Sequence, residues 1–186
     1  MNKLKFFGVV SGLLLCSTNA VANDYEYDKF SMGTSNYKLS GGDKANGFDL
    51  QSRLLLPGDF LLKADFSRVE INSIDIDQYT YSAGIALANS DKSLTAIGLS
   101  TGTISASSNN EDIDFNSFDV IHSLKITDST ELNTRLSRVF VDDGVNYYEA
   151  EFGVGYKFAG DVGAFSRLTL TSESEMILTT GLEFNF

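Results

Sequence analysis

The sequence contains one histidine, His122, so any mechanism that needs an imidazole must use it. Asp119 lies three positions earlier, and Ser123 follows His122 directly. Successive side chains of a β-strand point to opposite faces, so Asp119 and His122 would face opposite sides of a regular strand. A second acidic pair, Asp75-x-Asp77, has the spacing of one strand face. Because acid–base catalysis needs its groups within hydrogen-bond reach, we predict no catalytic residue.

The chain ends in a segment, 176–186, in which large apolar residues alternate with small or polar residues. A membrane-spanning β-barrel requires this pattern, because apolar side chains face the lipid and polar side chains face the lumen. A soluble protein gains little from a terminal strand with one apolar face. The large apolar residues of one parity are Met176, Leu178, Leu182, Phe184 and Phe186, and the other parity carries Thr179, Gly181, Glu183 and Asn185.

Similar alternation recurs along the chain, and no helical period competes with it. The pattern predicts an all-β fold, a closed antiparallel transmembrane β-barrel of ten strands. Eight strands are the alternative, because 94–104 is poor in large residues and 164–172 is short. Tyr25 and Tyr27 differ in parity from Phe30 and Met32, which predicts a bulge in the first strand. The predicted strands are 25–38, 47–56, 60–71, 77–88, 94–104, 115–126, 132–141, 147–158, 164–172 and 176–186.

The segments between the strands predict the orientation of the barrel. Compact turns are expected at 57–59, 89–92, 127–130 and 160–163, and Pro57-Gly58 suits a type II turn. They alternate with connections at 39–46, 72–76, 105–114, 142–146 and 173–175. Outer-membrane barrels have short periplasmic turns, longer outer loops and an even strand number. Both termini are therefore expected in the periplasm.

Aromatic residues of the apolar faces gather near both predicted strand ends. Phe48, Phe118 and Tyr148 lie near one end, and Tyr156 and Phe158 lie near the other. Two aromatic girdles around an aliphatic band are typical of membrane interfaces. A soluble β-sandwich would instead place its aromatic residues in mid-strand.

The N-terminal segment predicts export. Lys3 and Lys5 precede an apolar stretch, and Ala20-Val21-Ala22 forms a small-x-small cleavage site. Residues 1–22 are interpreted as a signal peptide, which leaves 23–186 as the barrel domain. The one cysteine, Cys16, lies in the signal peptide after Leu15, which is a poor setting for lipidation. The net charge of −11 argues against nucleic acid as a partner.

The signal peptide and the ending Leu182-Glu183-Phe184-Asn185-Phe186 resemble those of small outer-membrane β-barrel proteins of the OmpA/OmpX-like superfamily. The resemblance covers 23–186 in architecture. It implies a location in the bacterial outer membrane among lipids and lipopolysaccharide. It also implies that the outer-membrane assembly machinery reads Leu182, Phe184 and Phe186.

Charged residues on the lumen-facing parity balance one another, with equal numbers of acids and bases. Buried charges are costly unless paired, and a barrel of this size is about filled by side chains. We therefore expect an ion-pair network in an occluded lumen. A narrow selective pore, the alternative, would favour one sign of charge. The predicted network is Asp49, Arg53, Lys63, Asp65, Asp119, Lys125, Arg135, Glu149, Glu151, Lys157, Arg167 and Glu183.

Excess acidic residues fall in or beside the predicted outer loops. Solvated loops explain them most simply, although divalent cations held between carboxylates and lipopolysaccharide phosphates are possible partners. Arg68 and Arg138 take the lipid-facing parity near the outer rim, where a guanidinium can pair with lipid phosphate or simply extend to the interface. The acids are Asp75, Asp77, Glu111, Asp112, Asp114, Asp142, Asp143, Glu173 and Glu175.

Enzymatic families offer only distant likeness. Asp75-x-Asp77 with Asp119 and His122 distantly resembles omptin proteases, which are ten-stranded but much larger. Lipid A deacylases use His and Ser two residues apart, whereas position 124 here is Leu. We predict no enzymatic activity, no cofactor and no metal centre. The expected function is structural or surface-interacting, with a narrow porin-like channel as the alternative and a protease or lipid A-modifying enzyme as a remote one.

Overall fold

A computed structural model describes residues 27–108, 112–142 and 144–186. The predicted signal peptide, its cleavage site before Asn23, Tyr25, Glu111 and Asp143 lie outside these ranges. Within them, no helix has the length and apolar character needed to cross a membrane.

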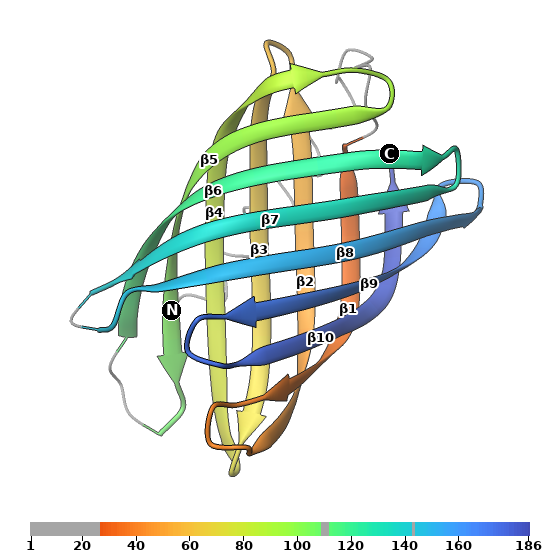
Figure 1. Cartoon of the computed structure of the whole chain (residues 1–186). Coiled ribbons are helices and arrows are strands. Elements are labelled where there is room, and N and C mark those ends of the chain that lie inside the picture. The colour runs from red at the N-terminus through yellow and green to blue at the C-terminus, as the bar shows by residue number, and fades with distance from the viewer. Residues whose placement is uncertain (1–26, 109–111, 143) are drawn as a thin grey trace.

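Ten antiparallel strands close into one barrel, in the order β1-β10-β9-β8-β7-β6-β5-β4-β3-β2 (Figure 1). Closure occurs between the first and last strands, where Lys29 pairs with Asn185 and Lys38 pairs with Met176. The ten-strand prediction is confirmed, and the eight-strand alternative is wrong. The strands are β1 Lys29–Lys38, β2 Lys44–Leu56, β3 Phe60–Ile71, β4 Ile74–Asn89, β5 Ser93–Ala106, β6 Asp112–Thr127, β7 Thr130–Val141, β8 Tyr147–Ala159, β9 Val162–Thr171 and β10 Met176–Asn185.

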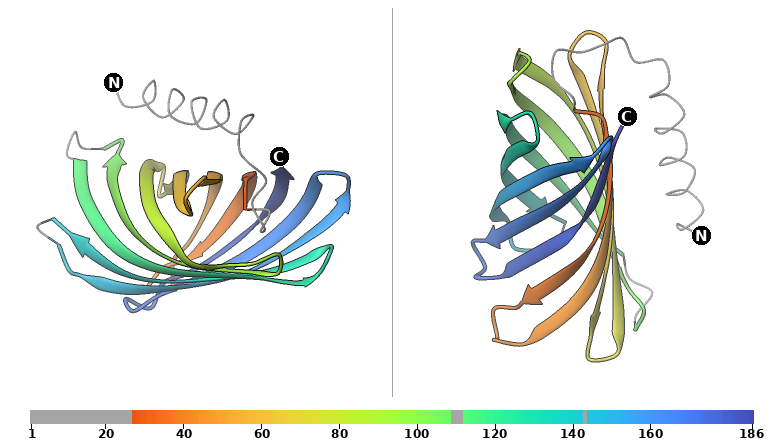
Figure 2. Two further views of the ribbon diagram at one scale, coloured as in Figure 1. Left: turned by 90° about the horizontal axis from the view of Figure 1, so that it is seen from above. Right: turned by 90° about the vertical axis from the view of Figure 1, so that its right-hand side faces the viewer.

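The strands are strongly tilted, as barrel closure requires. In Figure 1 the strands of the near wall cross those of the far wall steeply, and Figure 2 shows the same arrangement from two further sides. Phe186 lies at the same end as the connections 57–59, 90–92, 128–129 and 160–161, here called the terminus end. The opposite end, called the loop end, carries 39–43, 72–73, 107–111, 142–146 and 172–175.

One connection at the loop end differs from the prediction. A longer loop was expected at 72–76, but β3 and β4 continue to Ile71 and Ile74. Asn72 and Ser73 alone join them, with φ angles of 51° and 65°. Two successive positive φ angles form the tight turn that suits the twist of a hairpin. Connections at the loop end are therefore not uniformly longer than those at the terminus end.

The predicted bulge in the first strand is wrong over the described part of that strand. β1 pairs with both neighbours in continuous register from Lys29 to Lys38. Tyr27 precedes the strand and is buried, 2% exposed. It differs in parity from Phe30 and Met32 because it points into the barrel. The register shifts lie elsewhere, between Ala86 and Ala88, Lys125 and Thr127, and Lys157 and Ala159, all near the terminus end.

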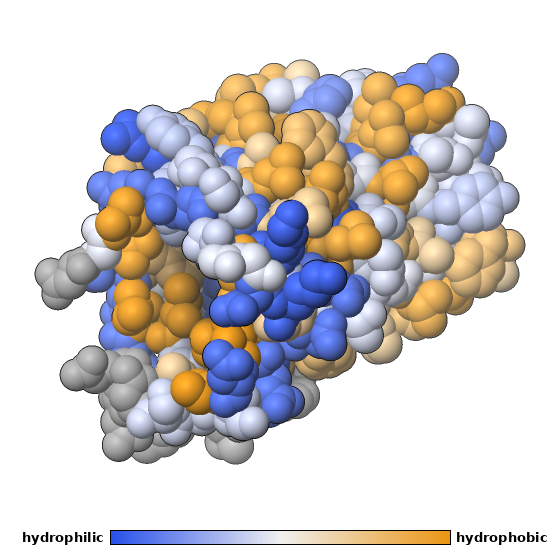
Figure 3. Space-filling model, turned by 60° about the horizontal axis from the view of Figure 1, so that its bottom comes forward, coloured by the Kyte–Doolittle hydropathy of each residue, from blue (hydrophilic) through white to orange (hydrophobic). Residues whose placement is uncertain are grey.

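Large apolar side chains are exposed around the outside of the barrel. Leu99 is 67% exposed, Leu136 57%, Phe152 50% and Leu182 43%, and these residues lie on four different strands. Figure 3 shows hydrophobic residues spread over the visible side of the barrel. Soluble monomers rarely expose a continuous apolar surface of this extent. A belt of this kind suits lipid as the surrounding solvent, as in transmembrane barrels.

Candidate functional site

The lumen is the candidate functional site, and ion pairs close it near the terminus end. The Lys29 ammonium lies 2.9 Å from Glu131 Oε2 and 3.5 Å from Glu183 Oε1. Arg53 Nη2 donates to Glu131 Oε1 at 2.9 Å. β2 and β7, which carry Arg53 and Glu131, are five neighbours apart in either direction around the ring. The pair therefore joins opposite walls of the barrel.

An apolar cluster lies beside these ion pairs in the lumen, at the same height along the barrel axis. Tyr27, Leu55, Leu61, Leu94 and Ala96 form a buried cluster inside the barrel. The Leu55 N–H donates to the Asp28 carboxylate at 2.7 Å, which fixes the chain next to Tyr27.

The two parts meet where the Arg53 guanidinium lies over the Tyr27 ring, 4.8 Å from its centroid. A cation over an aromatic face is attracted electrostatically to the ring. The ion pairs and the apolar cluster are thus in contact with each other. Together we call them the terminus-end layer.

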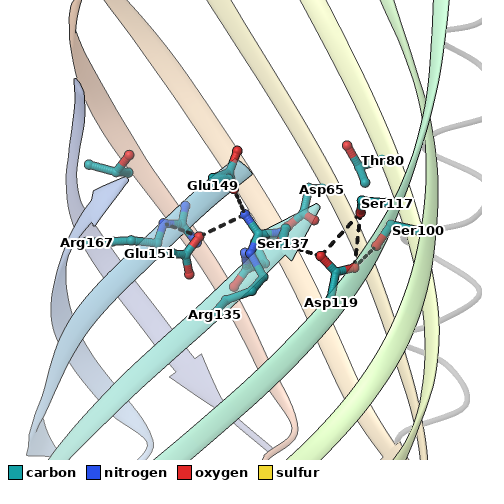
Figure 4. Close-up of polar contacts among 12 residues, drawn as sticks. Asp65, Thr80, Ser100, Ser117, Asp119, Arg135, Ser137, Glu149, Glu151 and Arg167 are labelled. Carbon is teal, nitrogen blue, oxygen red and sulfur yellow. Dashed lines mark hydrogen bonds and ion pairs between the residues drawn. The ribbon is translucent and has the colours of Figure 1, made fainter. Parts of the chain in front are cut away.

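A second set of ion pairs crosses the lumen further from the terminus end. We call it the central layer, and it consists of Asp49, Arg135, Glu149, Glu151 and Arg167. Arg135 pairs with Glu149 and also with Glu151 at 3.2 Å. Arg167 lies 2.5 Å from Asp49 and 3.8 Å from Glu151. Glu151 thus joins the two arginines, and its contacts are drawn in Figure 4.

Lys63 and Asp65 lie beside the central layer on β3. Their ammonium and carboxylate groups are 3.0 Å apart, and Gln51 donates to Asp65 at 2.8 Å. This small group adds an internally neutral pair to the lumen. Nine residues of the predicted network thus take part in ion pairs inside the barrel: Asp49, Arg53, Lys63, Asp65, Arg135, Glu149, Glu151, Arg167 and Glu183.

Asp119 differs from the expectation, because serine hydroxyls surround it. It is 2% exposed and accepts hydrogen bonds from Ser100, from Ser137 at 2.5 Å, and from Ser117 at 3.2 Å (Figure 4). The three serines lie on β5, β6 and β7. No ion pair of Asp119 is found among the described residues. Hydroxyl donors satisfy a buried carboxylate in place of a base.

Lys125 and Lys157 lie at the terminus end of the barrel. Lys157 reaches Asp161, a turn residue that is mostly exposed, at 3.6 Å. Both lysines line a recess of about 700 Å³ at the terminus end, together with Lys92, Asp91 and Asp128. Each lies beside a register shift, between Lys125 and Thr127 and between Lys157 and Ala159. They also line a smaller pocket together with Lys29, Glu131 and Glu183 of the terminus-end layer.

Sequence reasoning missed Lys29, Glu131 and Tyr27. Glu131 shares its parity with Asn133 and Arg135, but the predicted strand began one residue too late to include it. Lys29 shares its parity with Tyr27, and this shared parity could have identified both residues as lumen-facing. The mixed parity of the segment was instead interpreted as a bulge.

The remaining lumen space is divided by the two layers. A vestibule of about 230 Å³ lies on the loop-end side, and residues of the central layer line it. Between the layers lies a void of about 40 Å³ next to Arg53, Glu151 and Arg167. A further void of about 20 Å³ touches Lys29, Glu131 and Glu183. Pockets of this size hold a few waters at most, and they lie between the larger spaces at the two ends.

The candidate chemical residues lie apart. His122 points outward, and its Nδ1 lies 3.0 Å from the Thr95 hydroxyl, whereas Asp119 is buried inside the barrel. Asp77 binds Arg68 in a two-point ion pair on the outer face. Among the described residues, no group of three or more His, Cys, Asp or Glu side chains is placed to hold a metal. The structure therefore does not bring the candidate acid–base residues together.

The acidic residues near the loop end are partly in strands. Asp75 and Asp77 lie in β4, and Asp112 and Asp114 lie in β6. Ser105 donates to Asp112 at 2.6 Å, and Thr103 donates to Asp114 at 2.7 Å. Asp142, Glu173 and Glu175 lie in connections. Several of these carboxylates are thus hydrogen-bonded to neighbouring strands rather than held on free loops.

Comparisons with known proteins support the fold. No protein-family model and no curated protein sequence matches the chain. Among solved structures, the β domain of the Bordetella autotransporter BrkA matches 87% of this chain and 100% of its own, with a TM-score of 0.58 and 7% identity. The KdgM porin matches 84% of this chain and 99% of its own, with a TM-score of 0.49 and 11% identity. At these identities the likeness concerns the fold alone, which is that of outer-membrane β-barrels.

Proposed function

We propose that this chain is a non-enzymatic integral outer-membrane protein, a closed barrel with a structural or surface-interaction role. The ion pair between Arg53 and Glu131 on opposite walls is the observation that carries this proposal. A solute crossing the lumen would have to separate this pair and pass the Tyr27 cluster. Breaking a buried ion pair costs about 3–5 kcal/mol when one partner is left uncompensated. The central layer adds a second barrier of the same kind.

The proposed location is the bacterial outer membrane, with both termini in the periplasm. The exposed apolar belt, the even strand number and the signal-peptide pattern of 1–22 support it. Leu182, Phe184 and Phe186 share the outward parity of β10 and form the proposed signal for the assembly machinery. Membership of the OmpA/OmpX-like superfamily remains part of this proposal and rests on the two terminal signals.

The surface role follows from the loop end, which faces outward in this orientation. Asp142, Glu173 and Glu175 give the connections an acidic character. Such a surface suits contact with cationic partners and with divalent cations bridging to lipopolysaccharide. The connections are short, so the partner would contact strand ends as well as loops.

A narrow channel is the second candidate, and one observation favours it. The vestibule of about 230 Å³ and the recess of about 700 Å³ lie on opposite sides of the two layers. Displacement of the layers would join them into one polar path. In the closed barrel that we propose, the two layers keep them separate.

Fractionation and liposome swelling test the proposal. The protein should appear in outer-membrane fractions, begin at Asn23, and show heat-modifiable migration on a detergent gel. Recovery as a soluble periplasmic protein would contradict the location. Liposomes containing the refolded protein should swell in isotonic arabinose no faster than liposomes without protein. Rapid swelling would favour the channel.

A further inference from the structure

Two arginines lie on the outward-facing side of the barrel near the loop end. Arg68 on β3 pairs across strands with Phe48 and Asp77. Arg138 on β7 pairs with Phe118 and Tyr148. Both therefore lie at the height of the aromatic girdle. The two residues have the same charge and a similar position, but their surroundings differ.

Arg68 already has an anionic partner. Its Nε donates to Asp77 Oδ1 at 2.5 Å, and its Nη2 donates to Asp77 Oδ2 at 2.7 Å. Two parallel bonds of this kind use the donor edge of the guanidinium that would otherwise bind an external carboxylate or phosphate. Arg68 and Asp77 together present no net charge to a ligand.

Arg138 instead lies against aromatic rings. Its guanidinium carbon is 5.1 Å from the ring centroid of Phe140 and 5.6 Å from that of Tyr148. Phe140 is the next outward residue towards the loop end, so the guanidinium extends towards that end. Within 27–108, 112–142 and 144–186, no carboxylate forms an ion pair with Arg138. The rings hold the cation in place and leave its N–H donors available.

We propose that Arg138, Phe140 and Tyr148 form a binding site for the phosphate of an anionic membrane lipid. The inference rests on the proposed membrane location. A guanidinium offers two parallel N–H donors that match two phosphate oxygens. Asn116 pairs across strands with Phe140 and can add an amide donor from β6.

The surface below the guanidinium fits an acyl chain. Leu136, the preceding outward residue of β7, is 57% exposed, and Phe118 on β6 is 45% exposed. An anionic lipid would place its phosphate at Arg138 and its chains along these apolar side chains. Free phosphate lacks the second set of contacts, so we expect the lipid to bind and inorganic phosphate not to compete.

Native mass spectrometry of the refolded full-length mature barrel in a neutral maltoside detergent tests the site. The probes are dimyristoyl phosphatidylglycerol and dimyristoyl phosphatidylcholine at equal concentration, with inorganic phosphate as a competitor. The unaltered protein should retain phosphatidylglycerol preferentially. Arg138→Gln should weaken this retention about tenfold, the factor expected for loss of a charge-assisted hydrogen bond. Arg68→Gln, with the same change of charge on the same face, should leave it unchanged.

Arg138→Lys controls for a loss of side-chain packing as the cause of weaker binding. It keeps the positive charge and should retain more phosphatidylglycerol than Arg138→Gln. Equal losses in these two variants, equal losses in Arg138→Gln and Arg68→Gln, or no lipid preference in the unaltered protein would each overturn the inference. Displacement of the lipid by inorganic phosphate would also overturn it. Failure of the protein to insert into bilayers would instead contradict the proposed function.

Discussion

Arg53 on β2 and Glu131 on β7 form an ion pair of 2.9 Å across the full width of the barrel. Neither residue is near the other in sequence, and their strands are not neighbours in the sheet. The contact exists because a ten-strand barrel is narrow enough for long side chains to meet at its axis. Lys29 and Glu183 extend this contact, and Tyr27 packs under Arg53. Side chains from opposite walls of the barrel therefore meet in its lumen.

Glu151 should be essential for stability, whereas Val154 on the same strand should not. Glu151→Leu leaves Arg135 and Arg167 without one carboxylate each in the interior. The free energy of unfolding should fall by about 3–5 kcal/mol, as for other broken buried pairs. Val154 is 43% exposed on the outer face, so Val154→Leu should be nearly silent. Equilibrium unfolding in urea or guanidinium with detergent micelles measures both, and the reverse ranking would mean that the inner and outer faces of β8 are exchanged.

Asp119 should respond to substitution as a hydrogen-bond acceptor rather than as half of an ion pair. Asp119→Asn keeps one carbonyl acceptor for the three serine hydroxyls. Asp119→Leu removes the acceptor of Ser117 and Ser137, whereas Ser100 can still donate to Ser82. Unsatisfied buried polar groups cost about 1–3 kcal/mol, so the leucine variant should lose that much more stability than the asparagine variant in the same unfolding assay. Equal losses would indicate that the charge of Asp119 is what matters.

The last residue should control assembly in cells. Deleting Phe186 removes the aromatic terminus and should sharply reduce the amount of heat-modifiable protein in the outer membrane. Phe186→Tyr keeps an aromatic ring and should assemble nearly normally. Phe186 is 47% exposed, and deleting it also removes the hydrogen bond from its N–H to the Asp28 carbonyl at 3.3 Å, whereas Phe186→Tyr keeps this bond. Quantitative detergent gels of membrane fractions provide the measurement, and similar behaviour of the two variants would show that the terminal signal was misinterpreted.

Alternation predicted the strands well, because a period of two determines which face each side chain takes. The predicted strand 60–71 agrees with β3 in both bounds, and the terminal segment forms β10. The connection 72–73 was missed because Asn72 and Ser73 adopt positive φ angles that no strong turn motif announces. Local patterns thus predict strands better than they predict how tightly two strands are joined.

The alternation of residues along each strand predicted which charged residues face the lumen, but not which of them form ion pairs. Partners across the barrel depend on the number of strands and on the stagger of the whole ring. Asp119 illustrates this limit, since its hydrogen-bond donors on β5 and β7 are the serines Ser100 and Ser137. Gly102 illustrates the same limit of sequence reasoning. A Cβ at this position would lie 2.3 Å from the inward-facing ring of Phe115. Such fits appear only once the register is known.

Single-channel recording in planar bilayers tests the closed lumen most directly. Insertion is first verified by heat-modifiable migration of the reconstituted protein. The unaltered protein should then give no regular open level. A variant that removes charges from both layers should give discrete conductance steps. Its four substitutions are Arg53→Ser, Glu131→Ser, Arg135→Ser and Glu151→Ser. Reproducible steps of uniform size from the unaltered protein would contradict the account and establish a channel.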